Sequence, residues 1–222
     1  MRSPPFALFA WVEIEAPPFN SSPTDEDGDL VAAAAALSPP LRDALARIGP
    51  LWFPNREDRG LAVHLARAIV GQQLSTKAAR SIWARIESAA AANDQPLATF
   101  LRAENSAALR ACGVSSNKVK ALLSIGAAAA EGRLDGGLVR AMEHRARSAH
   151  LREIWGIGQW TCDMAAIFYC HDEDVWPAGD VSVQRTFAKF IGPRQPADAA
   201  QRFAPYRSIL ALYMWRLLDG AR

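Results

Sequence analysis

The sequence predicts an all-helical protein. Apolar residues recur at spacings of three and four along most of the chain, as on the buried face of a helix. Ser and Asp residues that favour helix N-caps, and Gly and Pro residues that end helices, bound these runs. Outside residues 1–28, no stretch alternates between apolar and polar residues over a useful length. We therefore expect about ten short helices within residues 29–222.

The first two predicted helices lie before residue 50. Asp29 suits the N-cap of an Ala-rich helix that stops at Ser38. Pro39 and Pro40 prevent that helix from continuing. The second proline can open the next helix, which ends at Gly49.

Later helices follow the same rules. Residues 61–69 have helical spacing and close at Gly71. Ser75, Ser106 and Ser116 each precede an apolar run that they can cap. The remaining predicted helices cover residues 138–147, 151–154, 159–170, 181–191 and 205–218.

Composition excludes several classes of protein. The chain has 222 residues, of which 50% are hydrophobic and 22% charged, a balance that argues against wholesale disorder. No apolar run reaches the ~18 residues that a membrane span needs. An odd number of cysteines (Cys112, Cys162, Cys170) fits a reducing compartment and cannot supply four ligands to an iron–sulfur cluster. Because no signal-peptide pattern begins the chain, we expect a cytoplasmic protein of the bacterial cytosol and nucleoid, or a nuclear one in a eukaryote.

Charge divides the chain into two parts. Residues 1–29 carry one base and six acids, a sum of −5, whereas the other 24 bases and 17 acids sum to +7. That basic body suits a polyanionic partner. The N-terminal arm, residues 1–28, contains five prolines and is predicted to be partly ordered or to form one edge strand. Residues 29–222 are expected to form the helical body.

The segment L-R-E-I-W-G-I-G-Q-W-T, residues 151–161, contains two glycines between two predicted helices. Gly156 and Gly158 permit positive φ and the close approach of another backbone, and the new helix presents N–H groups and a positive dipole end. These residues predict an anion site made of main chain. An ordinary turn between helices is the alternative that the glycines alone leave open.

This segment resembles the helix-hairpin-helix signature L-x-G-I-G-x-W-T-A. The loop V-W-P-A-G-D, residues 175–180, is similar to the Gly/Pro-rich loop and aspartate of helix-hairpin-helix base-excision DNA glycosylases, and Asp180 lies twenty residues after Trp160. Residues 68–79 are similar to the run A-I-x-G-Q-Q-x-S-x-K-A-A of the DNA-3-methyladenine glycosylase II branch, and residues 205–216 to its P-[WY]-R-x(5)-Y-x-W. The resemblance implies a two-lobed helical HhH-GPD DNA glycosylase fold, with a DNA-binding and active-site cleft between the lobes.

The resemblance also indicates a branch of the superfamily. Members with lyase activity carry a lysine at the position of Trp160, because an amine must form a Schiff base with the sugar. We therefore expect a monofunctional enzyme with water as nucleophile. The cysteine count argues against the endonuclease III and adenine-mismatch branches. The arm is too short to be the N-terminal β-domain of some bacterial alkylation glycosylases.

Asp180 is the predicted catalytic residue. Breaking an N-glycosidic bond builds positive charge at C1′, and a carboxylate near that carbon stabilises the charge and can orient or deprotonate water. Asp180 lies in a loop just before a predicted helix, whose N-terminal dipole favours negative charge. An ordinary helix N-cap is the alternative.

Aromatic residues are predicted to form the base pocket. A purine alkylated at N3 or N7 is cationic, so aromatic side chains can bind it through stacking and cation–π contacts. Trp160 and Met164 share a helix face with Phe168, which we assign to the core. The resemblance places pocket tryptophans at Trp160 and Trp215. The predicted pocket residues are Trp160, Trp215, Met164 and, as a weaker candidate, Trp52, with burial in the core as the alternative.

The remaining site predictions concern DNA and ions. Base flipping leaves a gap in the duplex, which the resemblance assigns to the turn after G-Q, with Gln73 preferred over Leu74. The alternative is a Gln-rich helix end with a buried leucine. Lys77, Lys118 and Lys120 are candidate phosphate contacts, or solvated surface. The predicted DNA-binding residues are Gly156, Ile157, Gly158, Gln159, Thr161, Gln73, Leu74, Lys77 and Lys118.

No metal site or cofactor is predicted, because His64 and His171 lack partners at metal-ligand spacing. The resemblance implies only a Na⁺ or K⁺ ion on hairpin carbonyl groups when DNA is bound.

The predicted function is monofunctional base-excision repair of alkylated DNA. The enzyme would flip out purines of the 3-methyladenine and 7-methylguanine type and hydrolyse the N-glycosidic bond, leaving an abasic site. Double-stranded DNA with alkylated bases is the expected partner of a monomer that needs no other protein. Two alternatives remain: a non-catalytic helix-hairpin-helix module that binds lesions, and a glycosylase for deaminated or mismatched bases. Deleting residues 1–28 is expected to leave excision intact.

Overall fold

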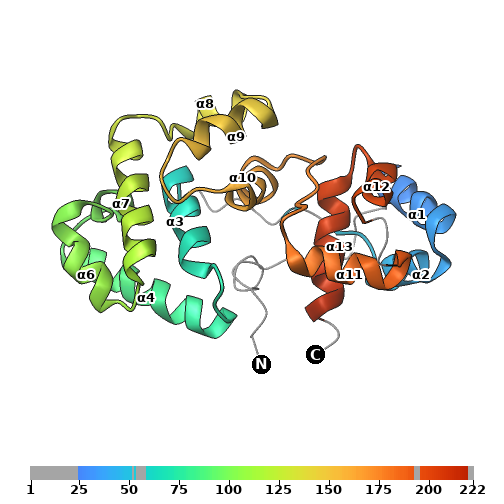
Figure 1. Ribbon diagram of the computed structural model, residues 1–222, viewed down its shortest axis with the longest axis horizontal. Helices are drawn as coiled ribbons and strands as arrows, with labels where there is room; N and C mark the ends of the chain where they lie inside the picture. The colour runs from blue at the N-terminus through green and yellow to red at the C-terminus, as the bar shows by residue number, and fades with distance from the viewer. Residues whose placement is uncertain (1–24, 52, 54–58, 193–195, 220–222) are drawn as a thin grey trace. The chain divides into compact units, whose positions relative to one another are not determined.

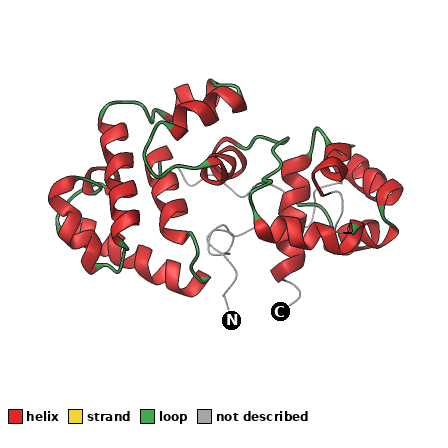
Figure 2. Cartoon of the chain, in the orientation of Figure 1, coloured by secondary structure: helices red, strands yellow, loops and turns green. Residues whose placement is uncertain are grey.

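A computed structural model describes residues 25–51, 53, 59–192 and 196–219 of the chain. All regular structure in these ranges is helical, with no strand among them, which confirms the predicted fold class (Figure 2). The chain forms two compact units. Described residues 59–170 belong to one, here called the inserted unit; described residues before 54 and after 170 form the other, the split unit. Residues 1–24 of the N-terminal arm lie outside the described residues, as does Trp52.

The split unit joins helices from both ends of the chain. α1 packs against α2, α11 against α13, and α2 contacts both α11 and α13 (Figure 1). Hydrogen bonds from Ser38 Oγ to Phe190 O and from Tyr213 Oη to Gly49 O, both 2.9 Å, connect the early helices to the late ones. The elements are α1 (Asp25–Leu37), α2 (Pro39–Ile48), α11 (Val181–Ile191), α12 (Pro196–Ala200), η4 (Gln201–Phe203) and α13 (Arg207–Asp219).

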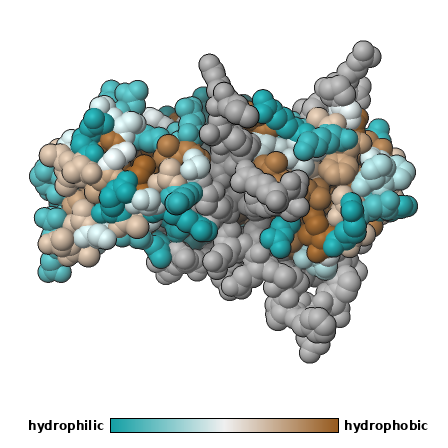
Figure 3. All heavy atoms as spheres, turned by 90° about the horizontal axis from the view of Figure 1, so that it is seen from below, coloured by the Kyte–Doolittle hydropathy of each residue, from teal (hydrophilic) through white to brown (hydrophobic). Residues whose placement is uncertain are grey.

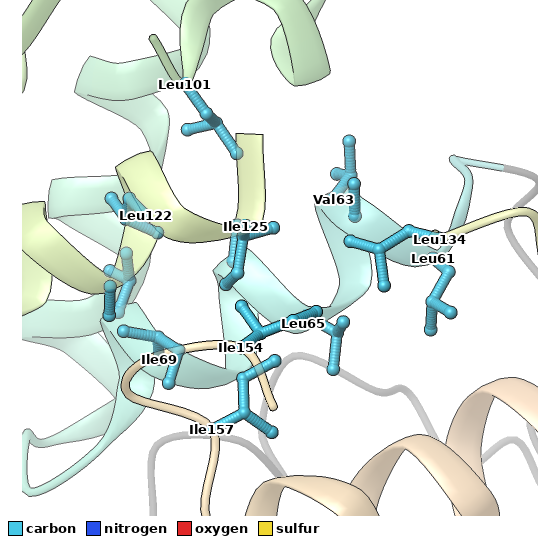
Figure 4. Close-up of a cluster of buried hydrophobic side chains, with 14 of the residues drawn as sticks. Leu61, Val63, Leu65, Ile69, Leu101, Leu122, Ile125, Leu134, Ile154 and Ile157 are labelled. Carbon is cyan, nitrogen blue, oxygen red and sulfur yellow. The ribbon is translucent and has the colours of Figure 1, made fainter. Parts of the chain in front are cut away.

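The inserted unit is built around α3, which contacts α4, α7 and α10. Ile154 and Ile157 of the predicted hairpin belong to the same buried cluster as Leu65 and Ile69 of α3 (Figure 4). The elements are α3 (Leu61–Gly71), α4 (Thr76–Ala92), α5 (Leu97–Phe100), η2 (Ala103–Asn105), α6 (Ser106–Ala111), α7 (Ser116–Ala130), α8 (Gly136–Ala141), α9 (His144–Arg152), α10 (Gln159–Ala165) and a π-helical turn, η3 (Ala166–Cys170).

Several predicted helix ends are confirmed. Ser38 caps α2 by accepting the N–H of Leu41, with proline in the first turn, and Gly49 ends that helix at φ 77°. Ser75 caps α4 by accepting the N–H of Ala78. These ends were predictable because they depend on residues adjacent in sequence.

Other predicted boundaries were wrong. α1 begins at Asp25, so Asp29 lies inside the helix and a truncation at residue 28 would cut its first turn. Ser106 and Ser116 are the first residues of their helices, and Asn105 and Ser115 occupy the N-cap positions.

The region after residue 130 also differs. The single helix predicted over residues 138–147 is two helices, because Met142 adopts an extended conformation, ψ 140°, and ends α8. Asp135 caps α8 through the N–H of Leu138, at 2.8 Å. The short helix predicted over residues 151–154 is instead the end of α9. α5 and α12 were not predicted at all.

The described residues on one face of the molecule are mixed in hydropathy. On the face shown in Figure 3, hydrophilic residues lie beside smaller hydrophobic patches. The described helices include none with the length and hydropathy to cross a membrane.

Candidate functional site

The hairpin between α9 and α10 is a tight turn anchored in the core. The Ile157 N–H donates to Ile154 O at 3.1 Å, and the Cys162 N–H donates to Gly158 O at 3.1 Å to open α10. Ile154 and Ile157 are buried, so Ile157 offers a ligand its main chain and not its side chain. The first N–H groups of a helix have no partner within it, so the start of α10 is suited to an anion.

The two hairpin glycines have different roles. Gly156 has φ +90°, and a Cβ built there would lie 2.5 Å from Cβ of Ala121 in α7. Gly158 has an ordinary φ of −100°, and a Cβ built there would meet nothing within 4 Å. Gly156 therefore serves the packing of the hairpin on α7, whereas Gly158 leaves open space at the start of α10.

Trp155 and Lys120 meet beside the hairpin. The Lys120 ammonium lies 4.1 Å from the centroid of the Trp155 ring, within cation–π distance, and Trp155 is 45% exposed. The pair places a positive charge next to the predicted anion site. Trp155 was not selected from the sequence, since one aromatic before G-I-G gives no periodic signal.

The predicted plug lies on a strained turn after α3. Gln73 is exposed and has φ +57°, in the left-handed region that non-glycine residues seldom occupy. Leu74 is half-buried, and its N–H donates to Gly71 O at 3.3 Å. Gln72 Nε2 donates to Thr161 Oγ1 at 3.2 Å. This bond brings the predicted plug turn to the first turn of α10, although Thr161 itself is buried.

Lys118 also contacts this turn. Its Nζ donates to Val70 O at 2.8 Å and to Gln72 O at 2.7 Å. Burial lowers the pKa of this ammonium to about 8. The phosphate contact predicted for Lys118 stays a prediction, whereas the contacts seen are with main-chain carbonyls. Lys77, also a predicted phosphate contact, is exposed in the first turn of α4.

Asp163 and its surroundings were missed by sequence reasoning. This carboxylate is 4% exposed on α10, accepts a hydrogen bond from Gln159 Nε2 at 2.8 Å, and lies 3.8 Å from His144 Nε2. Burial raises its pKa to about 6. Burial also raises the pKa of the neighbouring Cys162 thiol to about 11. From the sequence alone, an acidic residue such as Asp163 is expected to be exposed to solvent, so only the fold reveals its burial.

Asp180 lies at the start of α11 in the split unit. It is 5% exposed, and its Oδ1 accepts the N–H groups of Ser182 and Val183, each at 3.0 Å, together with the Ser182 hydroxyl. The N-cap considered as the alternative to catalysis is therefore present. These capping bonds use one carboxylate oxygen and fix the orientation of the group.

The loop before Asp180 is held by the start of α13. Arg207 Nε and Nη2 donate to Oδ1 and Oδ2 of Asp174 at 2.6 and 2.9 Å. Ser208 Oγ accepts the Val175 N–H at 2.9 Å, and Trp176 packs edge-on against Phe187. Arg207 belongs to the P-Y-R motif seen in the sequence, but its role in holding this loop was not predicted.

The predicted pocket residues fall in both units. Trp160 is half-buried at the start of α10, and Met164 is buried on the same helix. Trp215 is buried on α13. Phe168 is buried as expected for a core residue. Their base-pocket role stays a prediction, and Trp52 lies outside the described residues; its neighbour Phe53 stacks on His171.

No metal centre is evident in the described ranges. They contain no group of three His, Cys, Asp or Glu residues that could hold a metal ion. His64 packs against Tyr169.

Comparison with known proteins identifies a family. The model of the HhH-GPD superfamily of base excision DNA repair proteins matches residues 66–204, more than half of the chain. The chain is 32% identical to DNA-3-methyladenine glycosylase 1 of Schizosaccharomyces pombe over 179 residues, which cover 74% of this chain and 76% of that protein. It is 28% identical to DNA-3-methyladenine glycosylase 2 of Escherichia coli K12, over 67% of this chain and 55% of that protein.

Solved structures agree. The S. pombe 3-methyladenine DNA glycosylase in complex with abasic DNA aligns with a TM-score of 0.76 and 26% identity, covering 88% of this chain and 97% of that one. A DNA-3-methyladenine glycosidase from Bacillus halodurans aligns with a TM-score of 0.73 and 28% identity, covering 88% and 90%.

Proposed function

Because the chain belongs to the HhH-GPD superfamily of base excision DNA repair proteins, we propose that it is a DNA glycosylase that removes alkylated purines from double-stranded DNA. It hydrolyses the N-glycosidic bond and leaves an abasic site. The 3-methyladenine glycosylase activity in the names of its relatives supports the substrate class.

The reaction needs little acid catalysis. When the C1′–N bond of an alkylated purine breaks, the electron pair leaves with the base, and a cationic base departs neutral. Positive charge develops at C1′, where a fixed carboxylate stabilises it. Water then bonds to C1′ and gives up a proton, which Asp180 can accept.

One observation supports Asp180 in this role. Its carboxylate is buried and held by three donors at the start of α11, in a loop braced by Arg207. A carboxylate with a fixed orientation stabilises a transition state without reorganising at the moment of reaction.

The test is the Asp180→Asn variant. Asparagine is as good an N-cap as aspartate and keeps the Oδ1 acceptor, so the variant is expected to fold. We expect DNA binding to persist while release of 3-methyladenine falls by ~10²–10³-fold. Ser182→Ala, which removes one donor to the same oxygen, is the matched control and is expected to lose far less activity. Wild-type release by the Asn variant would refute the role of Asp180.

The enzyme is proposed to be monofunctional. A lyase needs an amine that forms a Schiff base with the sugar, and residue 160 is tryptophan. Borohydride is therefore expected to trap no covalent complex with a duplex that carries a lesion. Efficient trapping would contradict the water mechanism.

Further contacts complete the proposal. Trp160, Trp215 and Met164 hold the flipped base, and the hairpin main chain at Gly156 and Gly158 binds the DNA backbone. The reaction requires no cofactor, and a Na⁺ or K⁺ ion bridging hairpin carbonyls and a phosphate is the one ion proposed. The protein acts as a monomer on the chromosome. A panel of duplexes, each with one defined lesion, scored for abasic sites, tests the substrate range.

A further inference from the structure

The turn at residues 72–74 needs support from outside itself. Gln73 occupies the left-handed region at φ +57°, which favours glycine and, less often, asparagine. The Gln73 side chain is exposed, so it is not fixed by burial. Strained residues of this kind persist only when the surrounding structure holds them, and they concentrate at functional sites.

Two anchors hold this turn from residues distant in sequence. Lys118, in the first turn of α7, donates to Val70 O at 2.8 Å and to Gln72 O at 2.7 Å, and so binds carbonyls on both sides of Gly71. The second anchor is Thr161, whose Oγ1 accepts a hydrogen bond from Gln72 Nε2 at 3.2 Å. Both anchors lie within the inserted unit.

A lysine suits this position for physical reasons. The last carbonyls of α3 lack helical partners and form the negative end of the helix dipole. An ammonium group supplies several donors and a full positive charge to these oxygens. Its half-buried place opposes that charge, so the side chain is not an ordinary solvated lysine.

We propose that Lys118 is a positioning residue that fixes the turn carrying Gln73 so that Gln73 can enter the duplex as the base leaves it. The proposal rests on the glycosylase function proposed above. In this proposal Lys118 acts through the turn, in place of the phosphate contact predicted from the sequence, and touches no part of the DNA. Its effect should therefore appear only where a base must be removed from a paired stack, because single-stranded DNA leaves no gap to fill.

The experiment compares single-turnover excision of 3-methyladenine from duplex and single-stranded DNA. Lys118→Met keeps the unbranched shape and most of the length of the side chain and removes its donors. We expect the excision rate on duplex DNA to fall by ~10–100-fold, because a small misplacement of a group at the site can cost that much in rate. The excision rate on single-stranded DNA should stay within about twofold of wild type. Lys118→Arg, which can still donate to both carbonyls, should recover most of the duplex rate. Lys189→Met, an exposed lysine in the last turn of α11, is the matched control and should change neither rate.

Coupling to Gln73 is the second readout. If Lys118 acts through the turn, Lys118→Met should cause no further loss in a Gln73→Ala background. A fluorescent base analogue beside the lesion should also report slower flipping in Lys118→Met. Should Lys118→Met fail to fold, Lys118→Gln, which keeps one donor, takes its place and should give an intermediate duplex-specific loss.

The outcomes separate the two proposals. Equal losses on both substrates, or additive losses with Gln73→Ala, would overturn the role of Lys118 while leaving the glycosylase function intact. A wild-type protein that excises 3-methyladenine from neither substrate would overturn the proposed function itself.

Discussion

Arg207 forms a bidentate salt bridge with Asp174, in which Nε donates to Oδ1 at 2.6 Å and Nη2 donates to Oδ2 at 2.9 Å. The Asp174 main-chain carbonyl accepts a third bond from Nη2. The contact fixes the beginning of the loop that ends at Asp180. We expect Arg207→Leu to lower kcat for excision by ~10-fold with little change in KM, because the carboxylate loses its fixed position.

The expected loss of stability in Arg207→Leu is small, about 1 kcal/mol, since Asp174 is 37% exposed and water screens the pair. Denaturant unfolding measures it. Arg42→Leu, which breaks an exposed ion pair with Asp43 in the same unit, serves as the control. If both arginine variants lowered kcat alike, the loop would not depend on Arg207.

Alanine substitutions at the two hairpin glycines should affect different properties, one the stability of the protein and the other its DNA affinity. Gly156→Ala should destabilise the protein by about 2–4 kcal/mol, because it combines positive φ with a contact against Ala121. Gly158→Ala should fold with nearly wild-type stability and lose DNA affinity, since its Cβ would enter only the space left for a ligand. Thermal unfolding and DNA-binding titrations check the pair. Full DNA affinity in Gly158→Ala would show that the hairpin main chain does not approach DNA there.

Lys120, stacked on Trp155, should contribute one phosphate contact. We expect Lys120→Met to weaken binding to all duplexes alike and to reduce the slope of log K against log salt by ~1. Anisotropy titrations at several salt concentrations measure that slope. Trp155→Ala should have a smaller effect of the same kind, because the charge remains but loses its ring partner. An unchanged slope in Lys120→Met would place Lys120 outside the DNA contact.

Asp163 should make stability depend on pH. Its pKa is raised by burial from 3.8 to about 6, so the folded state binds the proton more tightly than the unfolded state does. This carboxyl group therefore makes stability fall as pH rises from about 4 to 6. Asp163→Asn should lack this pH dependence. Its free energy of unfolding relative to that of the wild type should therefore increase by about 1–3 kcal/mol between about pH 4 and pH 7.5. Urea unfolding at both pH values tests it, with exposed Asp43→Asn as control; equal pH dependence in wild type and Asp163→Asn would contradict the assignment.

Sequence reasoning succeeded where a feature depends on neighbouring residues. The Ser38 and Ser75 caps, the end of α2 at Gly49 and the tight turn at Gly156 all follow from local backbone chemistry. It failed by one residue at Ser116, because two serines in succession can each precede a helix and the local sequence does not distinguish them.

Long-range partners could not be predicted. Lys118 reads as a surface lysine near a helix start, and only the fold brings it to carbonyls 46 and 48 residues away. Arg207 reads as part of a motif, but its partner Asp174 lies 33 residues earlier. The sequence predicts that Asp163 is exposed, but in the fold α10, which carries it, packs against α3 and α9. Each of these contacts depends on packing between helices that a single sequence does not specify.

The separation between partners also sets the order in which the protein can form during synthesis. The helices of the described inserted unit are complete once residue 170 has left the ribosome. By contrast, Ser38 must wait for Phe190, 152 residues later, and Gly49 for Tyr213, 164 residues later. A nascent chain thus acquires the hairpin before the loop of Asp180 is braced. Until α11 and α13 arrive, α2 has α1 as a partner but lacks the contacts that it makes with α11 and α13, and the apolar surface left exposed is what chaperones would bind on an unfinished chain.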